Sequence, residues 1–182
     1  MDRRVRYTVL ALTDALVQAL HREHISEISV KELCDAADVN RSTFYAHFKD
    51  KYDLLEYIKN EILDNIKRQL DREQLKNHRL ISRQALALIL EYVKTNAELF
   101  KALLSDNCDA SIQREIMDLA YRLTIPVHEE ENERVFKYYT GFGVMGCLSV
   151  VQTWLKDDMP ESPDELSGLM LDILYGGLDR HG

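Results

Sequence analysis

The chain has 182 residues, of which 46% are hydrophobic and 30% charged, with only seven glycines and three prolines. This composition excludes a disordered chain and favours helices over a turn-rich β fold. The net charge of −8 argues against a protein coated with basic surface. Residues 1–52 hold eight basic and eight acidic side chains, so the rest of the chain carries the whole negative charge. Only the N-terminal part can therefore tolerate a polyanion.

The sequence predicts no targeting or membrane segment. No apolar run approaches the roughly 20 residues that a membrane span needs, and the N-terminus lacks the apolar core and cleavage site of a signal peptide. The three cysteines, Cys34, Cys108 and Cys147, are widely spaced, which is typical of reduced thiols and not of a disulfide framework or a metal site. We expect a cytoplasmic protein without a metal ion or cofactor.

The first 40 residues predict two helices and a tight turn. Apolar residues recur at helical spacing over residues 3–23, which indicates an amphipathic helix. Ser29 and Glu32 have the S-x-x-E spacing of a capping box that begins a second helix. Asp38 stands where the chain must then turn, and aspartate tolerates a left-handed backbone better than most side chains.

Two further helices follow this turn. Asn40 can cap a short helix over about residues 41–48, in which Phe44 and Phe48 lie four apart and point into the core. Asp50 can cap a long fourth helix that continues to about residue 70. A helix, a tight turn and a second short helix, braced by a preceding helix, form the geometry of a helix-turn-helix DNA reader.

The remainder of the chain continues the helical pattern. Periodicity predicts helices over about residues 80–95, 97–104, 110–124 and 132–156. Ser162 and Glu165 form a second capping box, and Pro163 at the first helical position starts a last helix that ends near residue 176. The predicted fold class is therefore all-α.

The short third helix carries side chains suited to DNA. It spans only about two turns, so its outer face can be polar without loss to the core. That face carries groups that can hydrogen-bond to base edges and phosphates, namely Arg41, Ser42, Thr43, Tyr45 and His47. Lys51 falls in the first turn of the next helix, where free backbone N–H groups and the helix dipole favour a phosphate.

The stretch from Ser29 to Ile58 resembles the DNA-binding domain of the TetR/AcrR family of transcriptional regulators. The string T-F-Y-x-H-F-x-D-K-x-x-L-L, which begins at Thr43, is the most recognisable segment of that family. The resemblance covers about residues 5–58, and the family usually has glycine in place of Asp38. It implies phosphate contacts by Thr43, Tyr45, His47 and Lys51, and base readout by Lys31, Arg41 and Ser42.

The C-terminal part is similar to the C-terminal domain of a TetR subgroup common in Firmicutes, over Tyr92 to Asn107 and Gly141 to Ser162. Some relatives with this region are activators, so the sign of regulation stays open. The resemblance implies a domain that binds small ligands in a cavity among its helices. The candidates for lining such a cavity, which are otherwise ordinary core or interface residues, are Phe100, Met117, Tyr121 and Tyr139.

Gly141, Gly143 and Gly146 interrupt an apolar helix, where each costs about 1 kcal/mol relative to alanine. Three together suggest that a neighbouring helix packs very closely or that the helix kinks. TetR-like dimers build a four-helix bundle from their last two long helices, so the resemblance implies a dimer surface here. Its candidates, which could instead fill only the core of the monomer, are Gly143, Gly146, Val150, Trp154, Leu166, Leu169, Met170 and Ile173.

We therefore predict an all-α homodimer in which residues 1–50 read DNA, residues 51–76 form a linking helix, and residues 77–182 dimerise and sense any small-molecule effector. The two recognition helices would enter successive major grooves of a near-palindromic operator, roughly 34–36 Å apart. One rival is a TetR-fold protein-interaction module that does not bind DNA. The other is an enzyme, for which only Cys108 and Cys147 are candidate nucleophiles and no motif provides a base.

Overall fold

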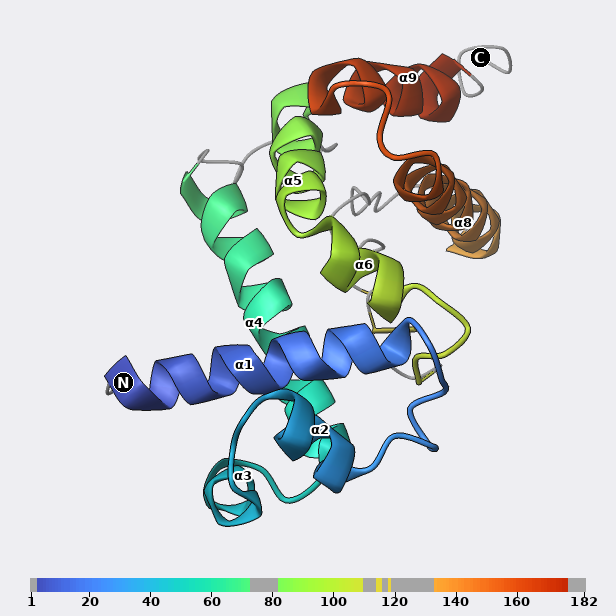
Figure 1. Ribbon diagram of the computed structural model, residues 1–182. Helices are drawn as coiled ribbons and strands as arrows, with labels where there is room; N and C mark the ends of the chain where they lie inside the picture. Colours follow the sequence, from blue (N-terminus) through green and yellow to red (C-terminus); the bar gives the residue numbers. More distant parts are fainter. Residues whose placement is uncertain (1–2, 73–81, 110–113, 116–117, 119–132, 177–182) are drawn as a thin grey trace. The chain divides into compact units, whose positions relative to one another are not determined.

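The computed structural model describes residues 3–72, 82–109, 114–115, 118 and 133–176 (Figure 1). All regular structure in these residues is helical, without a strand among them, which confirms the predicted all-α fold class. The chain divides into two compact units. The N-terminal unit comprises Met1–Asp64 and Glu98–Gln113, and the C-terminal unit comprises Asn65–Ala97 and Arg114–Gly182.

The N-terminal unit is built from short helices packed around one apolar core. It holds α1 (Arg3–Leu20), α2 (Val30–Ala36), α3 (Arg41–His47), most of α4 (Lys51–Arg72) and most of α6 (Ala97–Leu103). α1 packs against α2, and α2 packs against α3. The amphipathic spacing of each helix explains this packing, because the apolar side chains of one face become buried. The fully buried side chains at the centre include Leu12, Leu16, Leu20, Leu33, Phe44, Leu54 and Leu55.

The first helix ends at Leu20, slightly earlier than the predicted residue 23. The next amides donate hydrogen bonds in turn patterns instead of continuing the helix. The chain leaves the helical path because Ile25 and Ile28, which follow within the α1–α2 loop, are buried to within 1% of complete. Burial of two isoleucines thus ends a helix that its own periodicity would have continued.

Helix caps fix the start of α2 and α4 as predicted. The Ser29 hydroxyl accepts from the Glu32 amide at 3.2 Å, and the Glu32 carboxylate accepts from the Ser29 amide at 2.8 Å. Asp50 accepts from the amides of Tyr52 and Asp53 at 2.8 and 2.9 Å. Both capping predictions are confirmed, and the amides that would otherwise lack partners are satisfied.

The turn between α2 and α3 has the predicted backbone but not the predicted cap. Asp38 has a φ of 52°, the left-handed conformation that glycine most readily adopts and that aspartate tolerates. The side chain of Asn40 makes no capping hydrogen bond, so that prediction was wrong. Its backbone carbonyl accepts from Thr43 and Phe44 instead, at 2.9 and 3.0 Å.

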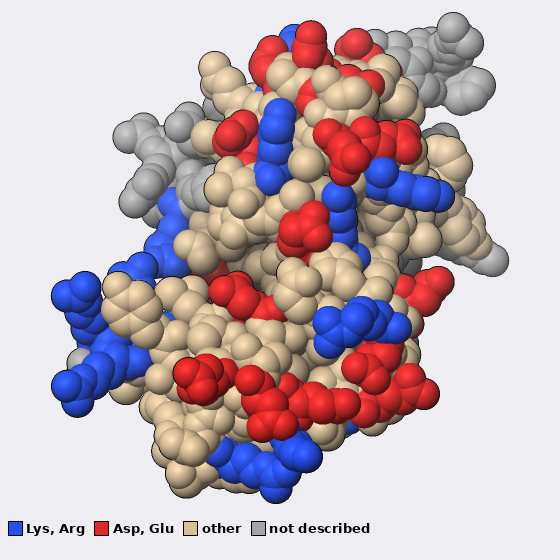
Figure 2. Space-filling model, in the orientation of Figure 1, with Lys and Arg blue, Asp and Glu red and all other residues tan. Residues whose placement is uncertain are grey.

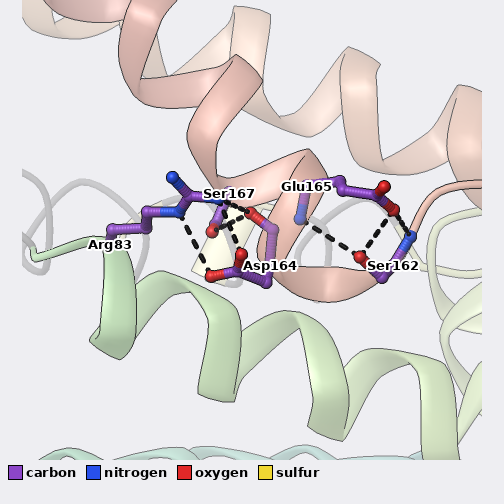
Figure 3. Close-up of polar contacts among 5 residues, drawn as sticks. All are labelled: Arg83, Ser162, Asp164, Glu165 and Ser167. Carbon is purple, nitrogen blue, oxygen red and sulfur yellow. Dashed lines mark hydrogen bonds and ion pairs between the residues drawn. The ribbon is translucent and has the colours of Figure 1, made fainter.

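The C-terminal unit contains α5 (Arg83–Thr95), α8 (Glu133–Lys156) and α9 (Pro163–Gly176). α5 packs along α9, and Figure 3 shows Arg83 of α5 reaching Asp164 in the first turn of α9. The Arg83 Nη2 atom lies 2.7 Å from the Asp164 carboxylate and 3.1 Å from the Asp164 carbonyl. Beside this pair Ser162 and Glu165 form the predicted capping box, which is confirmed (Figure 3).

The turn from α8 into α9 is held by Trp154. Its indole is 3% exposed, and its Nε1 donates to the carbonyl of Glu161 at 3.1 Å. One of the three helical glycines also serves this pairing, since a Cβ on Gly143 would lie 3.0 Å from Cδ2 of Leu174. A Cβ on Gly141 or Gly146 would meet nothing within 4 Å. Close helix packing therefore accounts for Gly143 alone.

The two units do not follow the predicted order of domains along the sequence. We expected boundaries at residues 50 and 76, with everything from residue 77 onward in one C-terminal domain. The segment Glu98–Gln113 instead belongs to the N-terminal unit. Its Asn107 donates from its side chain to the Leu20 carbonyl and accepts from the Ile25 amide, both at 2.9 Å. Most of the helix expected over residues 110–124 lies outside the described residues.

Candidate nucleic-acid interface

The recognition helix α3 is held by a single buried side chain. Phe44 is 0% exposed and is the only buried residue of this seven-residue helix. Its ring lies 5.8 Å from that of Phe48, which in turn lies 5.6 Å from the ring of Tyr57 in α4. These contacts have the spacing of favourable aromatic pairs. They fix one face of α3 on the core and leave the opposite face open.

The opposite face presents the side chains predicted to contact DNA. Arg41, Ser42 and His47 are exposed, Tyr45 is 58% exposed, and Thr43 is half-buried. Lys31, predicted to read bases, is exposed on α2. The structure thus places all six of these residues on α2 or α3, with donors and acceptors suited to base edges and phosphates.

Charge on the N-terminal unit is local. Figure 2 shows Lys and Arg side chains gathered at the N-terminal end of α1 and again below α2 and α3, with a row of Asp and Glu side chains above the second group. Balanced charges in residues 1–52 produce this pattern. Only a restricted part of the unit therefore offers a polyanion a favourable approach.

Lys51 differs from the other predicted contacts. Its ammonium does not extend freely into solvent, because Nζ donates to the carbonyls of Ser26 and Ile28 at 2.6 and 2.7 Å. The ammonium also lies 5.3 Å from the ring centroid of Tyr52. We expected free amides in the first turn of α4, whereas the Asp50 carboxylate already accepts from two of them.

The predicted ligand-lining residues do not come together in the described part of the chain. Phe100 is 4% exposed and belongs to the N-terminal unit, although we expected it in a C-terminal domain. Met117 and Tyr121 lie outside the described residues, and Tyr139 lies in α8 with a side chain that is not described. Within the described ranges no cluster of three or more His, Cys, Asp or Glu could hold a metal ion.

The cysteines have the environment of structural thiols. Cys34 and Cys108 are buried and Cys147 is half-buried. Burial raises the pKa of all three, and for Cys108 to about 11. Such thiols stay protonated near neutral pH, which disfavours nucleophilic chemistry. Among the described residues, the helices that could have crossed a membrane are all too short or too polar to do so.

The predicted dimer surface separates into two groups of residues. Trp154, Leu166 and Met170 are each 3% exposed, so they pack inside this chain and can add little to an interface. Gly143 faces Leu174 of the same chain. Val150 is half-buried, and the exposed members are Gly146, Leu169 and Ile173.

Sequence reasoning missed the most exposed apolar residues of the C-terminal unit. Phe142 is 81% exposed, Tyr138 64% and Met145 53%, all on α8. Their spacing of four and three residues places them along one side of the helix. A search for apolar residues in register with Gly146 could have found them. On α9, Leu169 and Ile173 are 50% and 57% exposed.

Comparison with known proteins identifies the family. Residues 12–58 match the family of bacterial regulatory proteins named after tetR, and residues 81–176 match a transcriptional regulator C-terminal region. This chain belongs to the TetR family of transcriptional regulators. The predicted family is thereby confirmed, and so is the expectation that the chain is a regulator and not an enzyme.

Relatives of this TetR-family chain share its fold at low sequence identity. The uncharacterized HTH-type transcriptional regulator YxbF of Bacillus subtilis (strain 168) is 20% identical over 161 residues, which cover 85% of this chain. The chain spans about two-fifths of the length of YxbF, the match covering 41% of that protein.

Three solved structures show the same fold. A TetR transcriptional regulator from Streptococcus agalactiae 2603V has a TM-score of 0.67 at 21% identity, covering 95% of this chain and 96% of its own. The dihydroxyacetone kinase operon activator DhaS has a TM-score of 0.59 at 15% identity, covering 94% and 96%. FadR from Bacillus subtilis, in complex with stearoyl-CoA, has a TM-score of 0.60 at 19% identity, covering 91% and 96%.

Proposed function

We propose that this TetR-family regulator binds a near-palindromic DNA operator as a homodimer, with α3 of each protomer in the major groove. The observation that carries the proposal is the division of α3 between a buried Phe44 and an outer face of polar side chains. Phosphate contacts fall to Thr43, Tyr45 and His47, whose hydroxyl and imidazole groups can donate to phosphate oxygens. Base readout falls to Lys31, Arg41 and Ser42.

The exposed apolar side of α8 and α9 supports the homodimer. Phe142 and Met145 on α8 are largely exposed, as are Leu169 and Ile173 on α9. Large apolar side chains grouped on one surface are typical of protein interfaces, and symmetric pairing of like surfaces is the commonest arrangement in soluble oligomers. A second copy of this chain, which offers the same apolar side, would cover both.

A small-molecule effector is a further part of the proposal. The structure of FadR from B. subtilis was obtained in complex with stearoyl-CoA, and DhaS is named as an activator. We extend effector control to this chain and leave the sign of regulation open. An effector must bind the DNA-competent and DNA-incompetent states unequally. Such a regulator would act beside the chromosome, in the bacterial cytoplasm.

The direct test is selection of bound duplexes from fragmented genomic DNA. The parent chain is compared with an Arg41→Ala, Tyr45→Ala double variant, which alters only exposed side chains, and with Gln18→Ala, an exposed change on α1. We expect the parent and Gln18→Ala to enrich the same near-palindrome with a steep salt dependence, and the double variant to lose it. A folded, dimeric parent that enriches no sequence would refute DNA reading and favour the protein-interaction module.

A further inference from the structure

The α1–α2 loop carries two backbone carbonyls that face a side chain far away in sequence. Ile25 and Ile28 anchor the loop in the core. Between and after them, the carbonyls of Ser26 and Ile28 accept from Nζ of Lys51, which is 25 and 23 residues further along the chain. Ile28 directly precedes Ser29, the cap of α2. The ammonium thus joins the start of α4 to the start of α2.

These contacts occupy the ammonium. It has three protons, and two of them bind carbonyls at 2.6 and 2.7 Å, distances typical of strong charge-assisted hydrogen bonds. The side chain is half-buried and the ring of Tyr52 lies beside it at 5.3 Å. A phosphate that drew Lys51 outward would leave both carbonyls without this donor.

The start of α4 offers a phosphate little compensation. Its first amides donate to the Asp50 carboxylate, and the Asp53 carboxylate accepts from the amide of Lys49 at 2.9 Å. Two carboxylates therefore stand where an anion bound to a bare helix start would lie. Like charges repel there, which further separates Lys51 from a phosphate-binding role.

We propose that Lys51 is a positioning residue, which fixes α2 and hence α3 for DNA binding by holding the Ser26 and Ile28 carbonyls, and that it does not contact phosphate. The DNA-binding half of this inference rests on the proposed function. The holding of the loop does not, because it is a property of the free protein. α2 packs against α3, so the placement of one helix determines the other.

The test compares Lys51→Met, which keeps the aliphatic stem, with Lys49→Met, which removes the same charge from an exposed side chain two residues earlier. We expect Lys51→Met to lower the Tm of the free protein by roughly 5 °C and to speed amide exchange in α2, with Lys49→Met close to the parent. An unchanged Tm and unchanged exchange in Lys51→Met would overturn the inference, even if the parent binds no DNA.

DNA affinity distinguishes positioning from a phosphate contact and from a purely structural role. At a temperature where Lys51→Met is folded, we expect about 10-fold weaker operator binding with the parent's slope of log K against log salt concentration. A slope reduced by about 0.9 per protomer would show a lost phosphate contact and overturn the inference. Parental affinity despite a lower Tm would overturn it too.

One measurement needs no substitution and serves if Lys51→Met does not fold. The side-chain ammonium of Lys51 is observed by ¹⁵N NMR in the parent chain. Hydrogen bonds to two carbonyls should slow its proton exchange relative to the exposed ammonium of Lys49, and addition of operator DNA should leave its shift unchanged. Fast exchange in the free protein, or a large shift upon DNA binding, would contradict the proposal.

Discussion

Two adjacent aromatic residues in α3 should separate folding from DNA binding. Phe44 is 0% exposed and Tyr45 is 58% exposed. Replacing a fully buried phenylalanine with alanine removes its apolar burial and leaves a cavity, at a cost of about 3–5 kcal/mol. Because an ordinary domain has about 5–15 kcal/mol of stability in total, Phe44→Ala should consume much of it. The aromatic contact with Phe48, at 5.8 Å, is lost as well.

The loss should fall first on α3. Phe44 is the only buried side chain of the helix, and seven residues are too few for a helix to persist alone. We expect Phe44→Ala to lower the Tm by roughly 6–20 °C, at about 2–4 °C for each kcal/mol in a chain of this size. Phe44→Leu, which keeps most of the apolar volume, should lose much less.

Tyr45→Ala is the matched substitution on the other side of the helix. An exposed side chain away from special contacts changes stability by about 0.5 kcal/mol or less. Loss of a phosphate hydrogen bond in each protomer should weaken operator binding about 10-fold or more. Urea unfolding and fluorescence anisotropy with labelled operator measure both effects on the same preparations.

The reasoning fails under either of two results. A Phe44→Ala chain whose α3 amides stay as protected from exchange as the parent's would show that other contacts hold the helix. A Tyr45→Ala chain that lost as much stability as Phe44→Ala would show that the tyrosine is a core residue and not part of an open DNA-binding face.

Four further predictions concern other parts of the chain. Ser29→Ala should destabilise the protein by about 1 kcal/mol in urea unfolding, since it removes the α2 cap; equal midpoints would exclude a stabilising cap. The hydrogen bonds from Ser29 lower the pKa of Glu32 below 4.5, so its stabilising contribution is complete above pH 4.5 and is lost as the pH falls through the lowered pKa. Glu32→Gln should therefore flatten this part of the acid unfolding curve, and an unaltered curve would contradict the assignment. Phe142→Glu should convert the dimer to monomer in sedimentation, whereas Phe142→Leu should remain dimeric; a dimeric Phe142→Glu would place the interface elsewhere. Asn107→Ala should lower stability by about 1–2 kcal/mol because the Leu20 carbonyl loses its donor, and wild-type urea midpoints would show that water replaces the amide.

Local signals predicted the helices well because they act over a few residues. Ser29, Asp50 and Ser162 begin helices as the sequence indicates, since each cap bonds amides within its own first turn. Asn40 failed as a cap because its backbone carbonyl satisfies the same amides. Its type suited the position, but side-chain use depends on a rotamer that spacing does not determine.

Contacts between distant residues were beyond the same reasoning. Nothing local indicates that Lys51 points back to a loop 25 residues earlier, because a lysine stem has several rotatable bonds and its position alone suggests a phosphate contact. Phe100 was expected in the C-terminal domain because sequence order was taken as spatial order. Trp154 and Phe142 lie on one apolar helix, and only packing against α9 decides which is covered.

The return of Glu98–Gln113 to the N-terminal unit has a consequence for biosynthesis. The helices that would read DNA are complete once Asp64 has been made, yet the carbonyl of Leu20 and the amide of Ile25 wait for Asn107. At about 5–20 residues per second, ribosomes need roughly 2–9 s to add the intervening residues. A nascent chain therefore carries an unfinished N-terminal unit for several seconds, and a chimera cut after α4 would carry it permanently.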